Sequence, residues 1–135
     1  MSHFTTINTQ MVSESHLVEA LRELGFSEVE VHEEPENLYG YQGDVRPQKA
    51  NVIIRREHVG RASNDIGFAR NDDGVFQAFI SEYDRSRYDE KWLQRLTQRY
   101  AYHVTKDRLE EQDFTMVDEE VEEDETIHIT VRRMV

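Results

Sequence analysis

The chain has 135 residues, with 28 Asp and Glu against 16 Lys and Arg, a formal net charge of −12 and no cysteine. Its length predicts one domain, 1–135, that buries enough apolar surface to fold without a metal or a disulfide. The lack of cysteine excludes disulfides, thiolate catalysis and zinc–thiolate sites. We find no basic and apolar run typical of a secretory signal, and no apolar stretch of the roughly 18 residues that a membrane span requires. We therefore expect a soluble, intracellular protein.

The acidity is concentrated in one segment. Residues 110–125 contain ten of the acidic residues and no Lys or Arg, which leaves 18 acidic against 16 basic residues elsewhere. Because a nucleic-acid surface requires a dense basic patch, the overall charge argues against nucleic acid as a partner. We interpret the acidic run as a charged sheet edge that prevents pairing with other chains. Docking of a basic partner is the alternative.

The first elements expected are a strand, a helix and a second strand. Residues 4–9 are rich in Thr and Ile, which is typical of a strand. Apolar residues then recur at helical spacing from Ser13, a typical N-cap, to Gly25, a typical helix stop. Residues 29–32 alternate between Val and polar residues, as a half-buried strand does.

The middle of the chain predicts a loop followed by strands. Residues 33–49 contain both prolines and two of the six glycines, so we expect a loop there with a short strand over 38–41. Residues 51–57 predict a strand that is covered on both faces. Residues 66–70 and 75–83 flank an Asp-Gly turn, which predicts a hairpin.

The last part of the chain predicts a long helix and a hairpin. The pattern at residues 86–89 fits a capping box, and an apolar stripe continues to about Leu109. Residues 114–121 and 126–135 predict two strands around the acidic turn. The order indicates an α+β fold, a mainly antiparallel sheet with two helices packed on one face. The strand–helix–hairpin order occurs twice, which allows a pseudo-two-fold arrangement.

Seven short blocks stand in order up to His103: SHFTTI, LYGYQGD, VIIRRE, SNDIGF, ISEYDR, WLQRL and QRYAYH. Together they resemble the conserved hypothetical chloroplast reading-frame family numbered thirty-five, which occurs in red-algal plastids and cyanobacteria. The resemblance implies no chemistry, because that family has no established activity. It implies a cytoplasm of cyanobacterial type or a plastid stroma, and an accessory role beside a protein partner such as an AAA-type ATPase or a small accessory protein.

The tyrosines and arginines of these blocks favour a surface that binds a partner. Both residue types are frequent where protein partners are bound, and a glycine-flanked loop is a common place for such contacts. We therefore expect a non-enzymatic protein-binding or adaptor domain without a cofactor. Internal pairing, for example of Arg55 or Arg56 with Glu82, is the competing explanation for part of this set. The predicted contact residues are Tyr39, Tyr41, Gln42, Asp44, Arg46, Arg55, Arg56, Asn64, Asp65, Tyr100 and His103.

Two other classes of function stay open. A small enzyme or ligand-binding domain would use Asp44, Arg55, Asp65 and His103 around one pocket, with a carboxylate as acid or base. However, the chain has no nucleophile elbow, zinc-protease motif or phosphate loop. Nucleic-acid binding by the basic middle, residues 46–108, with the acidic end as a mimic, is the third class. The scattered histidines and the irregular acidic run predict no metal site.

Overall fold

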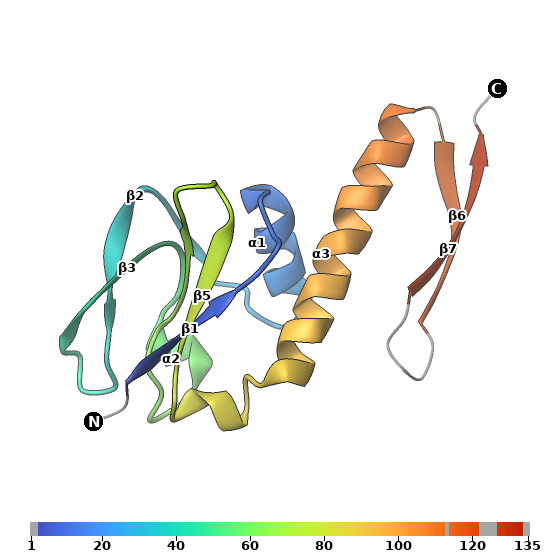
Figure 1. The fold of residues 1–135 in the computed structure, drawn as a ribbon. Helices are drawn as coiled ribbons and strands as arrows, with labels where there is room; N and C mark the ends of the chain where they lie inside the picture. The colour runs from blue at the N-terminus through green and yellow to red at the C-terminus, as the bar shows by residue number, and fades with distance from the viewer. Residues whose placement is uncertain (1–2, 113, 122–126, 134–135) are drawn as a thin grey trace.

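A five-stranded antiparallel sheet forms the centre of the molecule (Figure 1). The computed structural model describes residues 3–112, 114–121 and 127–133, with side chains for residues 3–112. The order of the strands in the sheet is β1-β5-β4-β3-β2, and every neighbouring pair is antiparallel. The strands are β1 (Phe4–Asn8), β2 (Glu30–Tyr39), β3 (Val45–Ile54), β4 (Ile66–Arg70) and β5 (Phe76–Ser81).

Two helices cover one face of this sheet. Helix α1 (Glu14–Glu23) and helix α3 (Glu90–Glu111) bury apolar side chains against the inward residues of the strands. The pattern of α1 ends as predicted, because Gly25 has a φ of 109° and the Phe26 N–H donates to the Leu21 carbonyl. The predicted α+β class, with two helices on one face, is confirmed.

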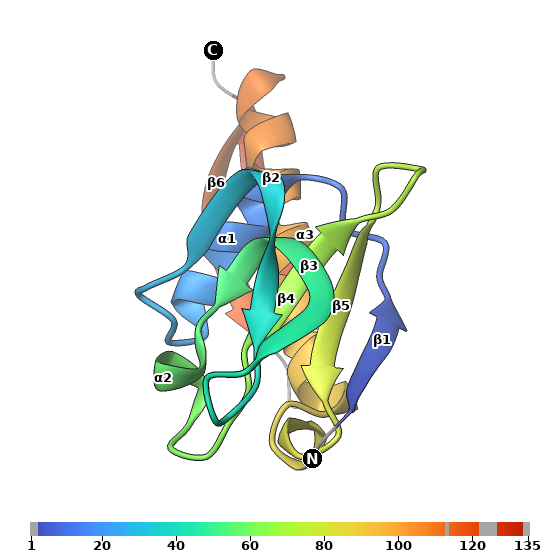
Figure 2. The ribbon, with the colours of Figure 1, turned by 90° about the vertical axis from the view of Figure 1, so that its left-hand side faces the viewer.

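The opposite face of the sheet is covered by its own hairpin. Strands β2 and β3 are both ten residues long and curve across β4 (Figure 2). Leu38 and Ala50 of this hairpin are fully buried with Ile53 in a second apolar cluster. A Cβ on Gly67 of β4 would lie 2.7 Å from the Ala50 Cβ, so only glycine fits beneath the hairpin.

The prediction of a loop over residues 33–49 is wrong, because most of this segment belongs to β2 and β3. Proline cannot donate to a strand ladder, so prolines are tolerated at edges and irregular positions. Pro35 lies in the edge strand β2, where the register with β3 shifts between Val31 and Glu36. Pro47 lies in the part of β3 that precedes its pairing with β4 at Val52. Both prolines therefore occupy positions where a strand tolerates them.

The start of α3 also differs from the prediction. Residues 84–86 form a short 3₁₀ helix, η1 (Asp84–Ser86), and the N-cap of α3 is Asp89 rather than Ser86. The Asp89 carboxylate accepts a hydrogen bond from the Trp92 N–H at 3.0 Å. The predicted strand 51–57 ends at Ile54, and a short helix, α2 (Arg56–Val59), follows it. The predicted β4–β5 hairpin is confirmed, with Gly74 at a φ of 79° in its turn.

The C-terminal strands β6 (Phe114–Val121) and β7 (Ile127–Arg133) pair with each other in a separate two-stranded sheet beyond α3 (Figure 1). The predicted acidic segment 110–125 thus enters β6, while its turn, residues 122–125, lies outside the described residues. Within the described backbone this hairpin does not extend the five-stranded sheet, so the two halves form no pseudo-two-fold sheet. Among the described helices, none is long and apolar enough to cross a membrane.

Candidate functional site

The turn between β2 and β3, residues 39–45, exposes aromatic and apolar side chains. We call it the β2–β3 tip. Tyr39 is 38% exposed, Tyr41 is 41% exposed and Val45 is 64% exposed. Tyr39 and Val45 are direct partners across the two strands, so their side chains are neighbours on one surface. The Gln42 amide donates to the Tyr41 hydroxyl at 3.1 Å.

The backbone of the tip is closed by its own hydrogen bonds. The Gly40 N–H donates to the Asp44 carbonyl at 2.8 Å, and the Gly43 N–H donates to the Gly40 carbonyl at 2.9 Å. Gly43 has a φ of 80°, a region that residues with a Cβ rarely adopt. A Cβ on Gly40 would overlap the Asp44 carboxylate. The positive φ of the tip therefore requires Gly43, whereas a side chain at position 40 would displace the Asp44 carboxylate.

Asp65 fixes the first half of the tip from beneath. Its side chain is fully buried, and its Oδ2 accepts a hydrogen bond from the Tyr39 N–H at 2.7 Å. Its Oδ1 accepts from the Arg56 N–H at 2.7 Å, and its own N–H donates to the Tyr39 carbonyl at 3.0 Å. One buried carboxylate thus connects the β2–β3 tip to the start of α2.

Arg55 neutralises this carboxylate. Its guanidinium donates to Asp65 at 2.9 Å and to Glu30 at 2.9 Å, and it lies 4.9 Å from the centre of the Tyr39 ring. Burial alone would lower the pKa of Arg55, but the hydrogen bonds to Glu30 and Asp65 outweigh it and raise the pKa above its ordinary value. The hydrogen bond from Arg55 likewise lowers the pKa of Glu30. Arg55 therefore remains a permanent cation with a structural role.

Asn64 fixes the second half of the tip. Its Oδ1 accepts from the Tyr41 N–H at 2.9 Å, and its Nδ2 donates to the Ser81 hydroxyl at 2.9 Å. The buried Asp84 carboxylate accepts from the Asn64 N–H at 3.0 Å and from the Ser81 hydroxyl at 2.7 Å. The sequence prediction omitted Ser81 and Asp84 as site residues, although the block ISEYDR contains both.

A cleft of about 210 Å³ lies beside the tip. Within the described residues the Arg56 guanidinium has no hydrogen-bonding or ion-pair partner, in contrast to Arg55. The cleft thus combines an exposed ring with an available cation. Its lining residues are Tyr39, Gly43, Arg55, Arg56, Glu57 and Asp65.

Three predicted contact residues lie away from this surface or beneath it. Arg46 is only 9% exposed and stacks over the Phe4 ring at 5.1 Å. Its guanidinium is also 3.9 Å from the carboxylate of Asp44. On α3, Tyr100 is 9% exposed and contacts the backbone before α1, while His103 contacts Glu23 of α1. The structure brings together the predicted residues of 39–44 and 55–65, and it places Arg46 beneath this surface and the pair on α3 away from it.

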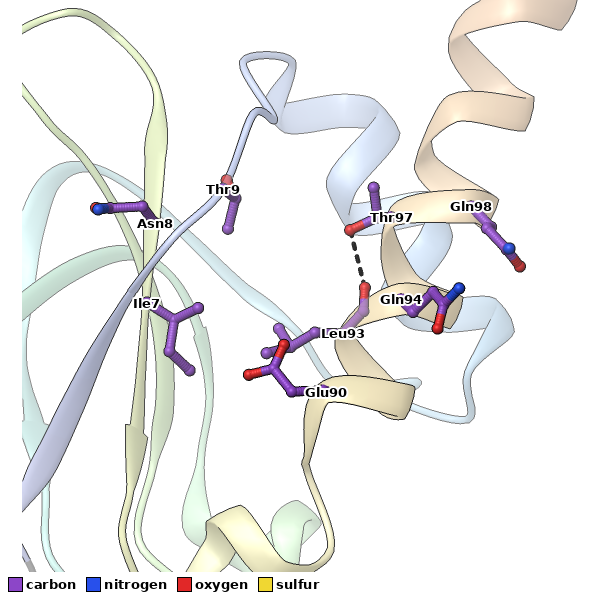
Figure 3. Close-up of a pocket in the computed structure, with 8 residues that line it drawn as sticks. All are labelled: Ile7, Asn8, Thr9, Glu90, Leu93, Gln94, Thr97 and Gln98. Carbon is purple, nitrogen blue, oxygen red and sulfur yellow. Dashed lines mark hydrogen bonds between the residues drawn. The ribbon is translucent and has the colours of Figure 1, made fainter. Parts of the chain in front are cut away.

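A larger groove, of about 560 Å³, lies between the edge strand β1 and helix α3 (Figure 3). Among the described residues, Glu90 is the one titratable residue that lines it, and the Thr97 hydroxyl donates within the helix to the Leu93 carbonyl at 2.8 Å. This described part of the lining therefore offers no acid–base pair. Within the described side chains no group of three or more His, Asp or Glu residues could hold a metal ion. The other lining residues are Ile7, Asn8, Thr9, Gln94 and Gln98.

Comparisons with known proteins give relatives but no function. The family model described as a protein of unknown function (DUF1257) matches residues 20–130. A protein of Cyanophora paradoxa, named uncharacterized protein ycf35, is 28% identical over 134 residues, which is 98% of each chain. A protein of Pyropia yezoensis with the same name is 26% identical over 140 residues, again 98% of each chain. No solved structure matches this chain significantly.

Proposed function

This chain belongs to the DUF1257 family of proteins of unknown function, which agrees with the family resemblance of its seven sequence blocks. Because the family gives no function, we propose a role from the structure of the chain itself. The role is that of a non-enzymatic protein-binding or adaptor domain that contacts its partner through the β2–β3 tip. One observation supports this proposal above the others. Two exposed tyrosines stand on a turn whose backbone is held by the buried side chains of Asn64 and Asp65.

A prearranged aromatic turn favours binding for a physical reason. Ordering a loop on association costs free energy, and a loop that is already fixed avoids most of that cost. Tyrosine and arginine are also the residue types that dominate the binding energy of many protein interfaces. Tyr41 would enter an apolar recess of the partner, and Arg56 would meet a carboxylate there.

The partner and its compartment belong to the proposal as well. The family resemblance implies an AAA-type ATPase or a small accessory protein as the partner. It also implies a setting in the cytoplasm of a cyanobacterial-type cell or in a plastid stroma. The relatives from Cyanophora paradoxa and Pyropia yezoensis, both named ycf35 proteins, are consistent with this setting.

The competing classes of function have less support. An enzyme that used Asp44, Arg55, Asp65 and His103 would need them around one pocket, but the cleft lined by Arg55 and Asp65 is not lined by the other two. Nucleic-acid binding would need a dense patch of free cations in the basic middle. Three of its arginines, Arg55, Arg85 and Arg99, contact carboxylates, and the net charge of −12 also opposes such binding.

Substitution of the tip tests the proposal. The full-length chain and its Tyr41→Ala and Arg56→Ala variants would be tagged and used to capture proteins from native cell extract. Proteins captured by the wild type would then be purified and their affinity measured by titration. We expect each variant to lower that affinity by at least tenfold, because truncating a central interface residue typically costs about 2 kcal/mol or more. Circular dichroism should show an unchanged fold, because the Tyr41 side chain is exposed and that of Arg56 is partly exposed.

Tyr83→Ala and Arg108→Ala provide the matched controls. Tyr83 is 56% exposed, Arg108 is exposed on α3, and neither belongs to the tip. Both controls should bind the partner with wild-type affinity. Unchanged affinity in the two tip variants, or an equal loss in the two controls, would contradict the proposed contact surface.

A further inference from the structure

A second concave site lies on the side of the molecule where α1 ends and α3 begins. It has a volume of about 280 Å³, and it collects residues from four separate segments. The turn after α1 supplies one wall, α2 supplies His58, the segment after η1 supplies Arg87, and α3 supplies Arg95. We call it the basic pocket; the rest of its lining is Leu24, Gly25, Phe26, Tyr88 and Trp92.

The charges of this pocket are all of one sign. Among the described residues, its lining contains two arginines and one histidine but neither Asp nor Glu, in a protein with 28 acidic and 16 basic residues. Within the described residues the Arg95 guanidinium has no hydrogen-bonding or ion-pair partner. Arg87 lies 5.5 Å from the Tyr88 ring centre and reaches the Val59 carbonyl only at 3.5 Å. Both guanidiniums therefore have donors to spare.

Packed aromatic side chains form the base of the pocket. The Tyr88 and Trp92 rings meet edge to face at 5.1 Å, and Phe26 packs 6.0 Å from Tyr88. The Tyr88 hydroxyl donates to the Val59 carbonyl at 2.9 Å, and burial raises the pKa of Tyr88, so it stays protonated. Arg87 and Arg95 are exposed at the rim of the pocket, where an anion can reach both guanidinium groups.

Basic residues near this pocket could instead stabilise the C-terminus of α1, because cations interact favourably with the carbonyl groups at the end of a helix. Two of its last carbonyls are already satisfied, since the Gly25 N–H donates to Arg22 and the Phe26 N–H donates to Leu21. A helix end accounts for one nearby cation. It does not account for three basic side chains that converge from three segments on one cavity.

We propose that the basic pocket binds a small ligand through the phosphate group of that ligand. This site is separate from the β2–β3 tip. Guanidinium groups present paired donors that fit phosphate oxygens. Two guanidinium groups carry two positive charges, which match a phosphate with a charge of about −1.5 to −2 better than a singly charged carboxylate. The volume lies near the lower limit of small-molecule sites, which favours a small phosphate monoester over a nucleoside triphosphate.

Titration with inorganic phosphate and with glycerol 3-phosphate tests this site. Calorimetry on the full chain, at constant ionic strength and in a buffer without phosphate, decides whether each probe binds. Fluorescence locates the event, because Trp92 is the only tryptophan of the chain and lines the pocket. We expect saturable heat with both probes and a saturable change in Trp92 emission. Tighter binding of the monoester would identify a phosphorylated metabolite as the ligand, whereas equal binding would identify free phosphate.

Variants of the two arginines complete the test. Arg95→Gln and Arg87→Gln should each weaken phosphate binding by about tenfold or more, because each removes a charge-assisted hydrogen bond. Arg108→Gln, on the exposed surface of the same helix and outside the pocket, should bind as the wild type does. The proposal is overturned if calorimetry shows no saturable binding. It is also overturned if both pocket variants bind with wild-type affinity, or if Arg108→Gln loses as much affinity as they do.

Discussion

The hydroxyl of Tyr100 joins the two long helices at the scale of a single residue. It accepts hydrogen bonds from the Val12 and Ser13 N–H groups, each at 2.9 Å, immediately before α1. Tyr100→Phe keeps the ring but leaves both donors without this acceptor. We expect the free energy of unfolding, measured by equilibrium urea titration, to fall by about 1 kcal/mol, since two partly buried hydrogen bonds are lost.

Tyr83→Phe is the matched control, because it removes the same hydroxyl from a side chain that is 56% exposed. Its unfolding free energy should stay within about 0.5 kcal/mol of the wild type. Equal effects of the two substitutions would show that the hydroxyl of Tyr100 does not stabilise the junction.

The sequence singled out a set of polar residues but could not say which of them would be internal. Tyr100, Asn64 and Asp65 were predicted as contact residues, and the structure places all three among the buried residues. Their partners lie far along the chain, 88 residues away for Val12 and 26 for Tyr39. Composition and periodicity describe neighbours in sequence, so they carry no information about such pairs. The exposure of Tyr39 and Tyr41 likewise depends on where Asp65 and Asn64 hold the turn.

At the scale of the elements, the curved β2–β3 hairpin depends on close contact with β4. A Cβ on Gly67 would lie 2.7 Å from the Ala50 Cβ and 2.8 Å from a Leu38 methyl. Gly67→Ala should therefore force the hairpin away from the sheet and lower the free energy of unfolding by about 1–3 kcal/mol, the usual cost of overpacking. Urea titration followed by circular dichroism measures this loss.

A second substitution separates the clash from other effects of alanine. Ala50→Gly removes the facing Cβ, so the double variant Gly67→Ala/Ala50→Gly should be more stable than the sum of the two single losses predicts. We expect a coupling of at least about 0.5 kcal/mol, the range found for residues in contact. Strict additivity would mean that the two positions do not meet.

Local signals explain which elements the sequence predicted. Gly25 ends α1 and Gly74 forms the β4–β5 turn because both positions need a positive φ, a requirement that is visible in the sequence. The strands around Pro35 and Pro47 were missed because proline normally argues against a strand. Its tolerance there follows from edge position and shifted register, which are properties of the assembled sheet.

At the scale of the whole molecule, two opposing electrostatic effects set the dependence of stability on pH. The net charge of −12 at pH 7 falls towards zero near the isoelectric point of about 4.9, which relieves general repulsion in the folded state. Specific carboxylates act in the other direction. Glu23 accepts hydrogen bonds from Arg99 and His103 and so ties α1 to α3, while Glu30 ties β2 to Arg55. We therefore expect stability to be greatest near pH 5.

Below that pH the Glu23 contact should be lost. Burial alone would raise the pKa of Glu23, but hydrogen bonds from His103 and Arg99 outweigh it and lower the pKa below its ordinary value of 4.5. A carboxyl group with a lower pKa in the folded state adds stability above pH 4.5 and loses it as pH falls through the folded pKa. Glu23→Gln should cost less than about 1 kcal/mol at pH 6, because the side chain is partly exposed and screened. It should also make the decline of stability below pH 4.5 shallower, as measured by urea titration at each pH. Glu28→Gln, at an exposed position, is the control and should keep the wild-type change of unfolding free energy with pH. If Glu23→Gln shows the same change as this control, the α1–α3 ion pairs do not cause the loss of stability in acid.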